Sequence, residues 1–241
     1  MSRVLGHEAD AEAAAIEVME SYGRYFAEAL WVDAKRVPEI LASTRVEGLD
    51  RLLEAKDAGT GMILALPHMG NWEVAAPVAV TRDISIVAVA ERLANKRITD
   101  WFTEMRAEFG IEIVLATGGT EVMRRLESAI HANKAVALLS DRDLKGRGVE
   151  VEFFGEKTTL PPGPGTLSVR TGAPLFPVAT YFADDGYRAV VRPALVIPEE
   201  GGRSDKVKTL TQALAAEMEK LISEAPTQWH LVQPNWPSDR E

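Results

Sequence analysis

The sequence of 241 residues contains no cysteine. This absence excludes disulfide scaffolds, thiolate zinc sites, iron–sulfur clusters and cysteine nucleophiles. Long apolar runs are also missing, because none approaches the roughly 18 residues needed to cross a bilayer. The first twenty residues lack the apolar core of a signal peptide. We therefore expect a protein that is soluble or lies on a membrane surface.

Acidic residues outnumber basic residues in the sequence. The chain has 27 basic and 36 acidic residues, a net charge of −9, which argues against nucleic acid as the main partner. The charge is uneven: residues 1–60 carry 7 basic and 12 acidic side chains, whereas residues 82–147 carry 11 and 10. An anionic ligand is therefore easier to place near the centre of the chain. The four histidines are too scattered to predict a metal site.

Apolar runs alternate with amphipathic segments, which predicts an α/β fold with a mostly parallel sheet flanked by helices. We expect strands at 62–66, 84–90, 111–115 and 135–139, a strand or extended arm at 149–154, and helices at 9–31, 47–57, 96–109, 119–132, 163–170 and 205–224. Residues 175–182 and 187–197 predict an antiparallel pair that makes the sheet mixed. No repeat or linker divides the chain. We expect one domain, 1–241, with a helical segment at about 1–58 and an α/β core at about 59–236.

The predicted helix 9–31 carries an apolar stripe. Tyr22, Phe26 and Leu30 stand four residues apart, so they share one helix face. One interpretation packs this stripe on the core, and the other lays it into lipid headgroups. The shortage of lysine on the polar face favours the first interpretation.

The strongest chemical signal is His68, which directly follows the buried strand 62–66. Ligands of open α/β sheets bind outside the strand ends, so this histidine is expected at the mouth of the sheet. Glu73 lies five positions on and can reach back towards the ring, fixing its tautomer and raising its basicity. The alternative is a helix-capping histidine beside an exposed glutamate.

A second group of charges, Asp141, Arg142 and Asp143, follows the buried run 135–139 in the same way. Loops from two strand ends of one sheet can meet, so Asp141 could supply or replace the carboxylate behind His68. The alternative is a surface loop whose charges pair with Lys145 or Arg147.

Residues 66–73 (LPHMGNWE) resemble the H-x4-[DE] signature of the bacterial lipid A biosynthesis (lauroyl/myristoyl) acyltransferase family. Further blocks resemble that family in the same order, at 46–49, 91–95, 141–143 with 151–155, 171–177 and 228–233. The third block, together with the missing membrane helix, is most similar to the actinobacterial phosphatidylinositol mannoside acyltransferases. Those relatives are longer, and the chain is expected to lack an N-terminal helical segment of theirs.

The resemblance implies an acyl-CoA-dependent O-acyltransferase that acts on a sugar or polyol hydroxyl of a membrane glycolipid, most simply a phosphatidylinositol mannoside. His68 would be the base, Asp141 would orient it, and Glu73 would share that task or hold the acceptor. The candidate substrate-binding residues are Glu91, Arg92, Arg106, Arg142, Asp143 and His230. Acyl-CoA would be the co-substrate, with no cofactor or metal, and the protein would lie peripherally on the cytoplasmic face of the membrane.

Several alternatives remain open at this stage. The acceptor could be a lipid A precursor or another polyol lipid. The chain could be a lipid-binding relative without activity, or a thioesterase. No Gly-x-Ser-x-Gly elbow is present, so we expect the acyl group to pass directly to the acceptor and not through an acyl-enzyme.

Overall fold

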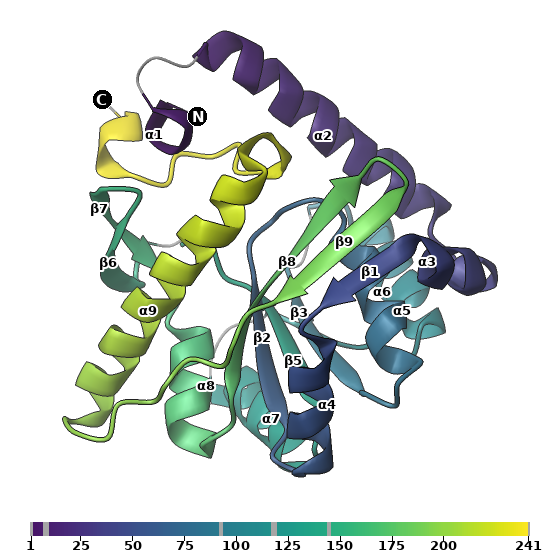
Figure 1. Cartoon of the computed structure of the whole chain (residues 1–241). Coiled ribbons are helices and arrows are strands. Elements are labelled where there is room, and N and C mark those ends of the chain that lie inside the picture. The colour runs from purple at the N-terminus through teal and green to yellow at the C-terminus, as the bar shows by residue number, and fades with distance from the viewer. Residues whose placement is uncertain (1, 7–9, 92–93, 117–119, 144–145, 241) are drawn as a thin grey trace.

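The centre of the molecule is a mixed sheet, seen in the computed structural model, which describes residues 2–6, 10–91, 94–116, 120–143 and 146–240. Seven described strands follow the order β1-β9-β8-β2-β5-β3-β4 (Figure 1). Their bounds are β1 (Thr44–Glu47), β2 (Met62–Leu66), β3 (Ile86–Ala90), β4 (Glu112–Leu115), β5 (Ala135–Leu139), β8 (Leu175–Ala183) and β9 (Gly186–Val191). Among the described strand pairs of this sheet, only β8–β9 is antiparallel. The predicted α/β class and mixed, mostly parallel sheet are confirmed.

Helices flank this sheet. The described α-helices are α1 (Ser2–Leu5), α2 (Ala11–Trp31), α3 (Val37–Ser43), α4 (Leu49–Asp57), α5 (Ala75–Val80), α6 (Lys96–Glu108), α7 (Thr120–His131), α8 (Gly163–Thr171) and α9 (Arg203–Glu224). Short 3-10 turns are η1 (Ala34–Arg36), η2 (Trp72–Val74), η3 (Pro226–Gln228) and η4 (Pro237–Arg240). Within the described residues, no helix combines the length and the apolar character needed to span a bilayer.

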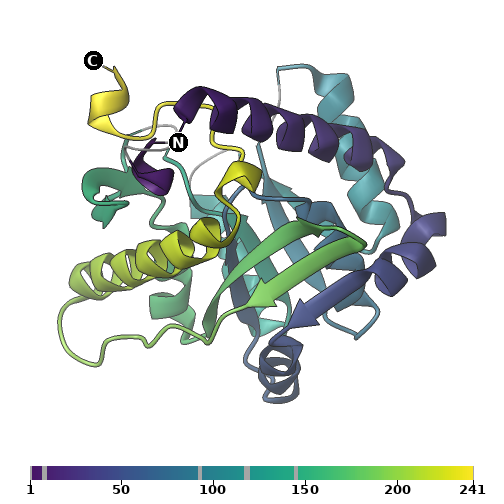
Figure 2. The same ribbon diagram turned by 45° about the horizontal axis from the view of Figure 1, so that its top comes forward.

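The sheet separates two apolar cores, because successive side chains of a strand point to opposite faces. In β2, Ile63 and Ala65 join the core that includes Leu126 of α7, Leu167 of α8 and Leu214 of α9. Met62, Leu64 and Leu66 join the second core, with Tyr25 of α2, Ile40, Leu52, Val74 and Met105. In Figure 2, α2 crosses the top of the view above the sheet. Every residue of β2 is buried, as its unbroken apolar run predicts.

The orientation of α2 differs from the expected one. Its buried residues are Ala14, Val18, Tyr25 and Ala29, whereas Phe26 is 46% and Leu30 72% exposed. The prediction that the stripe packs on the core is therefore wrong for Phe26 and Leu30. Two small alanines let the helix lie close to the body, and Tyr25 carries a hydroxyl that finds a buried partner described below.

Two strands were not predicted. β1 lies in the segment expected to be helical, and it pairs in parallel with β9. β7 (Glu156–Leu160) forms a separate antiparallel hairpin with β6 (Val149–Phe153). Both are short and contain Thr, Lys, Arg or Glu at alternate exposed positions, so neither has the continuous apolar run that marks a central strand.

Candidate active site

The parallel pairing of β2 with β5 brings two polar segments together. Leu66, the last residue of β2, is in register with Leu139, the last residue of β5. The pairing continues one step further, where Ser140 donates its backbone N–H to the carbonyl of Leu66 at 2.8 Å. His68 and Asp141 each follow their strand by two residues, so the strand register alone places them side by side.

His68 and Asp141 form a hydrogen-bonded pair. Imidazole Nδ1 lies 2.6 Å from Oδ1 of Asp141, and the backbone N–H of His68 donates to Oδ2 at 3.1 Å. Asp141 is fully buried, whereas the His68 side chain retains 14% exposure. An ionised carboxylate only accepts hydrogen bonds, so Nδ1 must carry the proton. In neutral His68 the lone pair is then on Nε2, which no described group contacts by a hydrogen bond.

The electrostatics of Asp141 favour this arrangement. Burial alone would raise the pKa of Asp141, but the charge and hydrogen bonds of His68 and the indole of Trp229 hold it below its ordinary value. Trp229 donates Nε1–H to Oδ2 at 2.8 Å. Asn235 donates its side-chain amide to the backbone carbonyl of Asp141 at 3.3 Å. Asp141 is therefore an ionised, immobilised acceptor.

The loop after His68 explains the small residues of its motif. Gly70 has φ +55°, and a Cβ there would lie 2.3 Å from the carbonyl oxygen of Thr180, so this turn under β8 requires glycine. Asn71 accepts a hydrogen bond from the backbone N–H of Glu73 at 3.1 Å, which begins η2. The Trp72 ring meets the His68 ring edge-on at 5.6 Å between centroids. The imidazole is thereby restrained by Trp72 of this loop as well as by Asp141.

Glu73 does not hold the imidazole. Its carboxylate accepts two hydrogen bonds from Arg106 of α6, at 3.0 and 2.5 Å, and one from the hydroxyl of Tyr25 at 3.3 Å. Glu73 is only 4% exposed. Glu73 thus ties the loop after β2 to α6 through Arg106 and to α2 through Tyr25. The predicted contact between the Glu73 carboxylate and the His68 ring is not formed. The carboxylate pairs instead with the charged guanidinium of Arg106, which lies beside it in the interior.

A cavity of about 440 Å³ opens beside His68 on the face of the sheet covered by α2, α4, α5 and α6. Its floor and walls are mainly apolar and rich in alanine, including Ala76, Ala79, Ala88 and Ala137. Small side chains at these positions leave the space unfilled. Its polar lining includes His68, Glu73, Glu91, Arg106, Arg142 and His230. A mainly apolar cavity that has an imidazole in its lining is suited to present an aliphatic chain to a base.

His230 joins the same cavity from the C-terminal segment. Its backbone N–H donates to the carbonyl of His68 at 2.7 Å, and Nε2 lies 2.9 Å from the hydroxyl of Ser21. Burial and the neighbouring His68 lower the pKa of His230 to about 4, so its ring is neutral at neutral pH. Nδ1 is buried and has no hydrogen-bond partner among the described residues.

The remaining predicted residues divide into two groups. Glu91 and Arg142 both line the cavity, and their charged ends lie 3.9 Å apart. Asp143 instead accepts hydrogen bonds from the backbone of Gly148 at 2.5 Å and from Thr159 at 3.0 Å, so it holds the base of the β6–β7 hairpin. Arg92 lies outside the described residues.

Sequence reasoning missed three aromatic residues of the site. Trp229 contacts Asp141 from 88 positions away. Tyr25 stacks on Trp72 with 4.1 Å between ring centroids. Tyr25 and Trp72 both line the cavity. A tryptophan next to His230 in a tail segment was a usable signal for Trp229, because buried indoles require an acceptor; Tyr25 carried no local signal of this kind.

Comparison with known proteins places the chain in a family. The sequence model of the bacterial lipid A biosynthesis acyltransferases matches residues 1–238. The chain is 38% identical over 222 residues to a phosphatidylinositol mannoside acyltransferase of Mycolicibacterium smegmatis, covering 92% of this chain and 71% of that one. It is 38% identical over 229 residues to a protein of the same name from Mycobacterium tuberculosis, covering 92% and 69%. The chain therefore belongs to the bacterial lipid A biosynthesis acyltransferase family.

Proposed function

We propose that this acyltransferase moves a fatty acyl chain from acyl-CoA to a sugar hydroxyl of a membrane glycolipid, and that the glycolipid is a phosphatidylinositol mannoside. The observation that carries the proposal is the His68–Asp141 pair, whose His68 lines a mainly apolar cavity, with Nε2 of His68 free of described partners. The names of the two mycobacterial relatives support the acceptor class.

The chemistry follows from the tautomer of His68. Nε2 takes the proton of the acceptor hydroxyl as its oxygen attacks the thioester carbonyl. The imidazolium that forms is stabilised by ionised Asp141, 2.6 Å from Nδ1. The tetrahedral intermediate then expels the CoA thiolate, which recovers the proton from Nε2. The ester product forms with no covalent enzyme intermediate.

The cavity provides the acyl site of this proposal. Its alanine-lined floor on β3 and β5 is apolar, so burying an alkyl chain there gains about 0.8 kcal/mol for each methylene. The thioester carbon would then lie near His68, where the lining changes from apolar to polar.

The polar end of the cavity provides the headgroup site. Arg142 offers a guanidinium for a phosphate, Glu91 offers an acceptor for sugar hydroxyls, and His230 adds a neutral ring to the lining. Arg92 stays a candidate from the sequence alone. Arg106 and Asp143 are already engaged by Glu73 and by the hairpin, so we assign them to supporting the site.

The outer face of α2 provides the membrane contact of this proposal. Ile16, Met19, Phe26 and Leu30 are each between 46% and 72% exposed. In an α-helix these four positions fall within an arc of about 80°, so they form one apolar stripe. Phe26 also lines the cavity, which opens beside this stripe. A lipid held at the cytoplasmic membrane face could therefore enter the cavity directly.

The test is an acyl-transfer assay with purified protein, palmitoyl-CoA and vesicles that contain or lack a phosphatidylinositol mannoside. We expect thiol release that depends on the acceptor, with an acylated glycolipid detected by mass spectrometry. A lipid A precursor in matched vesicles is the control for acceptor class.

Each other outcome contradicts a stated part of the proposal. Equal thiol release with and without acceptor would identify a thioesterase. Transfer to the lipid A precursor alone would overturn the acceptor. Palmitoyl-CoA binding without thiol release on any acceptor would identify a lipid-binding protein.

A further inference from the structure

The segment that follows α9 lies directly against the catalytic pair. Gly70 donates its backbone N–H to the carbonyl of Gln228 at 3.0 Å, and His230 donates to the carbonyl of His68 at 2.7 Å. Met69 and Trp229 form an antiparallel bridge between these two backbone contacts. The chain on either side of Trp229 is thus fixed to the loop that carries His68.

Trp229 is directed at Asp141 and not at the cavity. Its indole is 2% exposed and donates to Oδ2 of Asp141 at 2.8 Å, while Oδ1 faces Nδ1 of His68 at 2.6 Å. Trp229 does not line the cavity, so it cannot touch a substrate there. Oδ2 also accepts the backbone N–H of His68 at 3.1 Å, so the indole is the shorter of two donors to this oxygen and the one that comes from outside the loop of His68.

This hydrogen bond restricts a soft torsion. The terminal torsion of an aspartate is broad, so a carboxylate held only by the two N–H groups of His68 keeps freedom to rotate together with that residue. The indole N–H adds a third donor from a separate segment, and this donor fixes the carboxylate plane. We propose that Trp229 is a positioning residue for the acyl transfer proposed above: its indole N–H sets the plane of the Asp141 carboxylate, which in turn keeps the His68 ring in the Nδ1–H tautomer. The inference rests on that proposed function only for its effect on rate.

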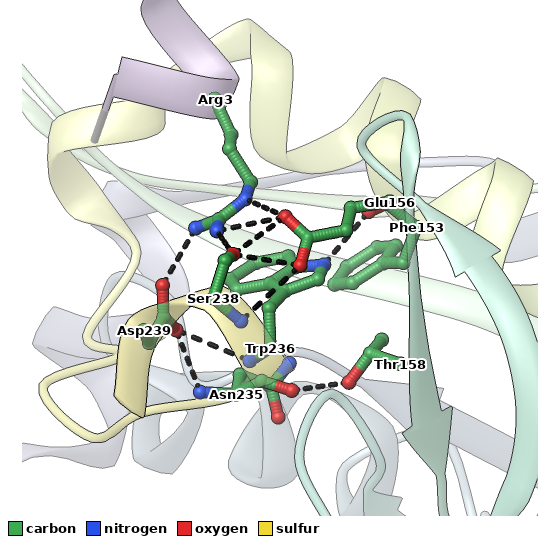
Figure 3. A network of polar contacts seen from close by, with 8 residues as sticks. All are labelled: Arg3, Phe153, Glu156, Thr158, Asn235, Trp236, Ser238 and Asp239. Atoms are coloured by element: carbon green, nitrogen blue, oxygen red, sulfur yellow. Dashed lines mark hydrogen bonds and ion pairs between the residues drawn. The ribbon is translucent and has the colours of Figure 1, made fainter. Parts of the chain in front are cut away.

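A second tryptophan of the same segment offers a matched control. Trp236 is 5% exposed, and its indole donates to the backbone carbonyl of Phe153 at 2.9 Å. Figure 3 shows it within a network in which Arg3 contacts Glu156, Ser238 and Asp239. Trp229 and Trp236 meet edge-on, with 6.2 Å between centroids. The two indoles share burial and one apolar cluster, but only Trp229 donates to a catalytic group.

The experiment compares Trp229→Phe and Trp236→Phe with the wild type. Both variants lose one buried indole hydrogen bond, so we expect both to lower the unfolding temperature. Only Trp229→Phe should lower kcat, by about tenfold or more, with the KM values for palmitoyl-CoA and acceptor within about twofold of the wild type. The acid limb of its rate profile, which belongs to the His68–Asp141 pair, should move to higher pH, because the indole stabilises ionised Asp141.

A spectroscopic readout separates this inference from the proposed function. The short Nδ1–H contact of His68 should give a downfield proton resonance that His68→Ala removes. We expect that resonance to be shifted or broadened in Trp229→Phe and retained in Trp236→Phe, whether or not the wild type transfers acyl groups. If Trp229→Phe keeps the wild-type resonance, or if both variants change kcat and the pH profile alike, Trp229 has no positioning role. An inactive wild type with the expected spectra would overturn the proposed function alone.

Discussion

Glu73 and Arg106 form a two-point ion pair that is almost completely shielded from water, with side-chain exposures of 4% and 17%. The pair joins the loop after β2 to α6 across one wall of the cavity. Because the pair is buried, its net contribution to the stability of the fold is small. Loss of one partner is nevertheless costly, because it leaves an uncompensated charge in the interior.

Removal of Arg106 should therefore destabilise the protein strongly. We expect Arg106→Met to lower the free energy of unfolding by about 3–5 kcal/mol, because Glu73 is left buried and ionised. The double variant Arg106→Met/Glu73→Gln should recover part of that loss. Urea unfolding followed by circular dichroism measures both. If the single and double variants were equally unstable, the ion-pair explanation would be contradicted.

His68→Ala should abolish transfer and leave the fold intact, because the ring lies beyond a strand end and contributes little to either core. We expect a loss on the order of 10³-fold in kcat. His131→Ala is the control, since that histidine is exposed at the end of α7. Thiol release is measured together with the unfolding temperature. Substantial turnover by folded His68→Ala would remove the base assignment.

Asp141→Asn should cost more rate than Glu73→Gln. Asparagine can present an N–H to Nδ1 and favour the wrong tautomer of His68, so we expect kcat to fall on the order of 100- to 1,000-fold. Glu73→Gln keeps hydrogen bonding to Arg106 and Tyr25, and should act mainly on stability. Steady-state kinetics of the two folded variants decide the order, and the reverse order would make Glu73 the orienting carboxylate.

His230 should make stability depend on pH. Burial and its neighbour His68 lower its pKa to about 4 in the folded state, whereas an unfolded histidine titrates near 6.5. The unfolded chain therefore binds more protons between these values, and stability present above about pH 6.5 is lost as the pH falls towards 4. The loss from this group approaches about 3 kcal/mol.

The measurement is the free energy of unfolding at pH 7 and at pH 4.5, for the wild type and for His230→Gln. We expect a smaller difference between the two pH values in the variant. His131→Ala should retain the wild-type dependence. An unchanged dependence in His230→Gln would show that His230 is not buried in its neutral form.

Filling the cavity floor should select against long acyl chains. Ala88 of β3 and Ala137 of β5 are register partners and both line the cavity. We expect Ala137→Leu to reduce kcat/KM for palmitoyl-CoA about tenfold or more and to change it little for octanoyl-CoA. The short donor serves as the internal control. An equal loss with both donors would indicate damage to the site and not a shortened cavity.

The strands that the sequence predicted correctly are those with continuous apolar runs, such as Met62–Leu66 and Ala135–Leu139, because burial on both faces leaves a local signal. β1 and β7 are half exposed, and their pairing depends on partners distant in the chain. The exposure of Phe26 and Leu30 was not predicted for a related reason. When apolar residues occur on all faces of a helix, the sequence pattern does not indicate which face is buried.

The residues of the candidate site divide in the same way. The sequence predicted that His68 and Asp141 could meet, because each follows a buried strand of one sheet. The pairing of Glu73 with Arg106 was beyond that reasoning, since it depends on how α6 lies relative to the loop after β2. The same holds for Trp229, which approaches Asp141 only after α9 has returned the chain to this edge of the sheet.

The register between β2 and β5 limits which changes of sequence the site can tolerate. The spacing between His68 and Asp141 is set by five consecutive backbone pairings between β2 and β5, whose side chains lie in the interior. A single inserted residue in either strand would separate the two groups and also turn the apolar side chains of that strand to the wrong face. If the proposed function holds, the loops and helices around the cavity can be exchanged without moving His68 and Asp141, so new substrate preferences are best engineered there.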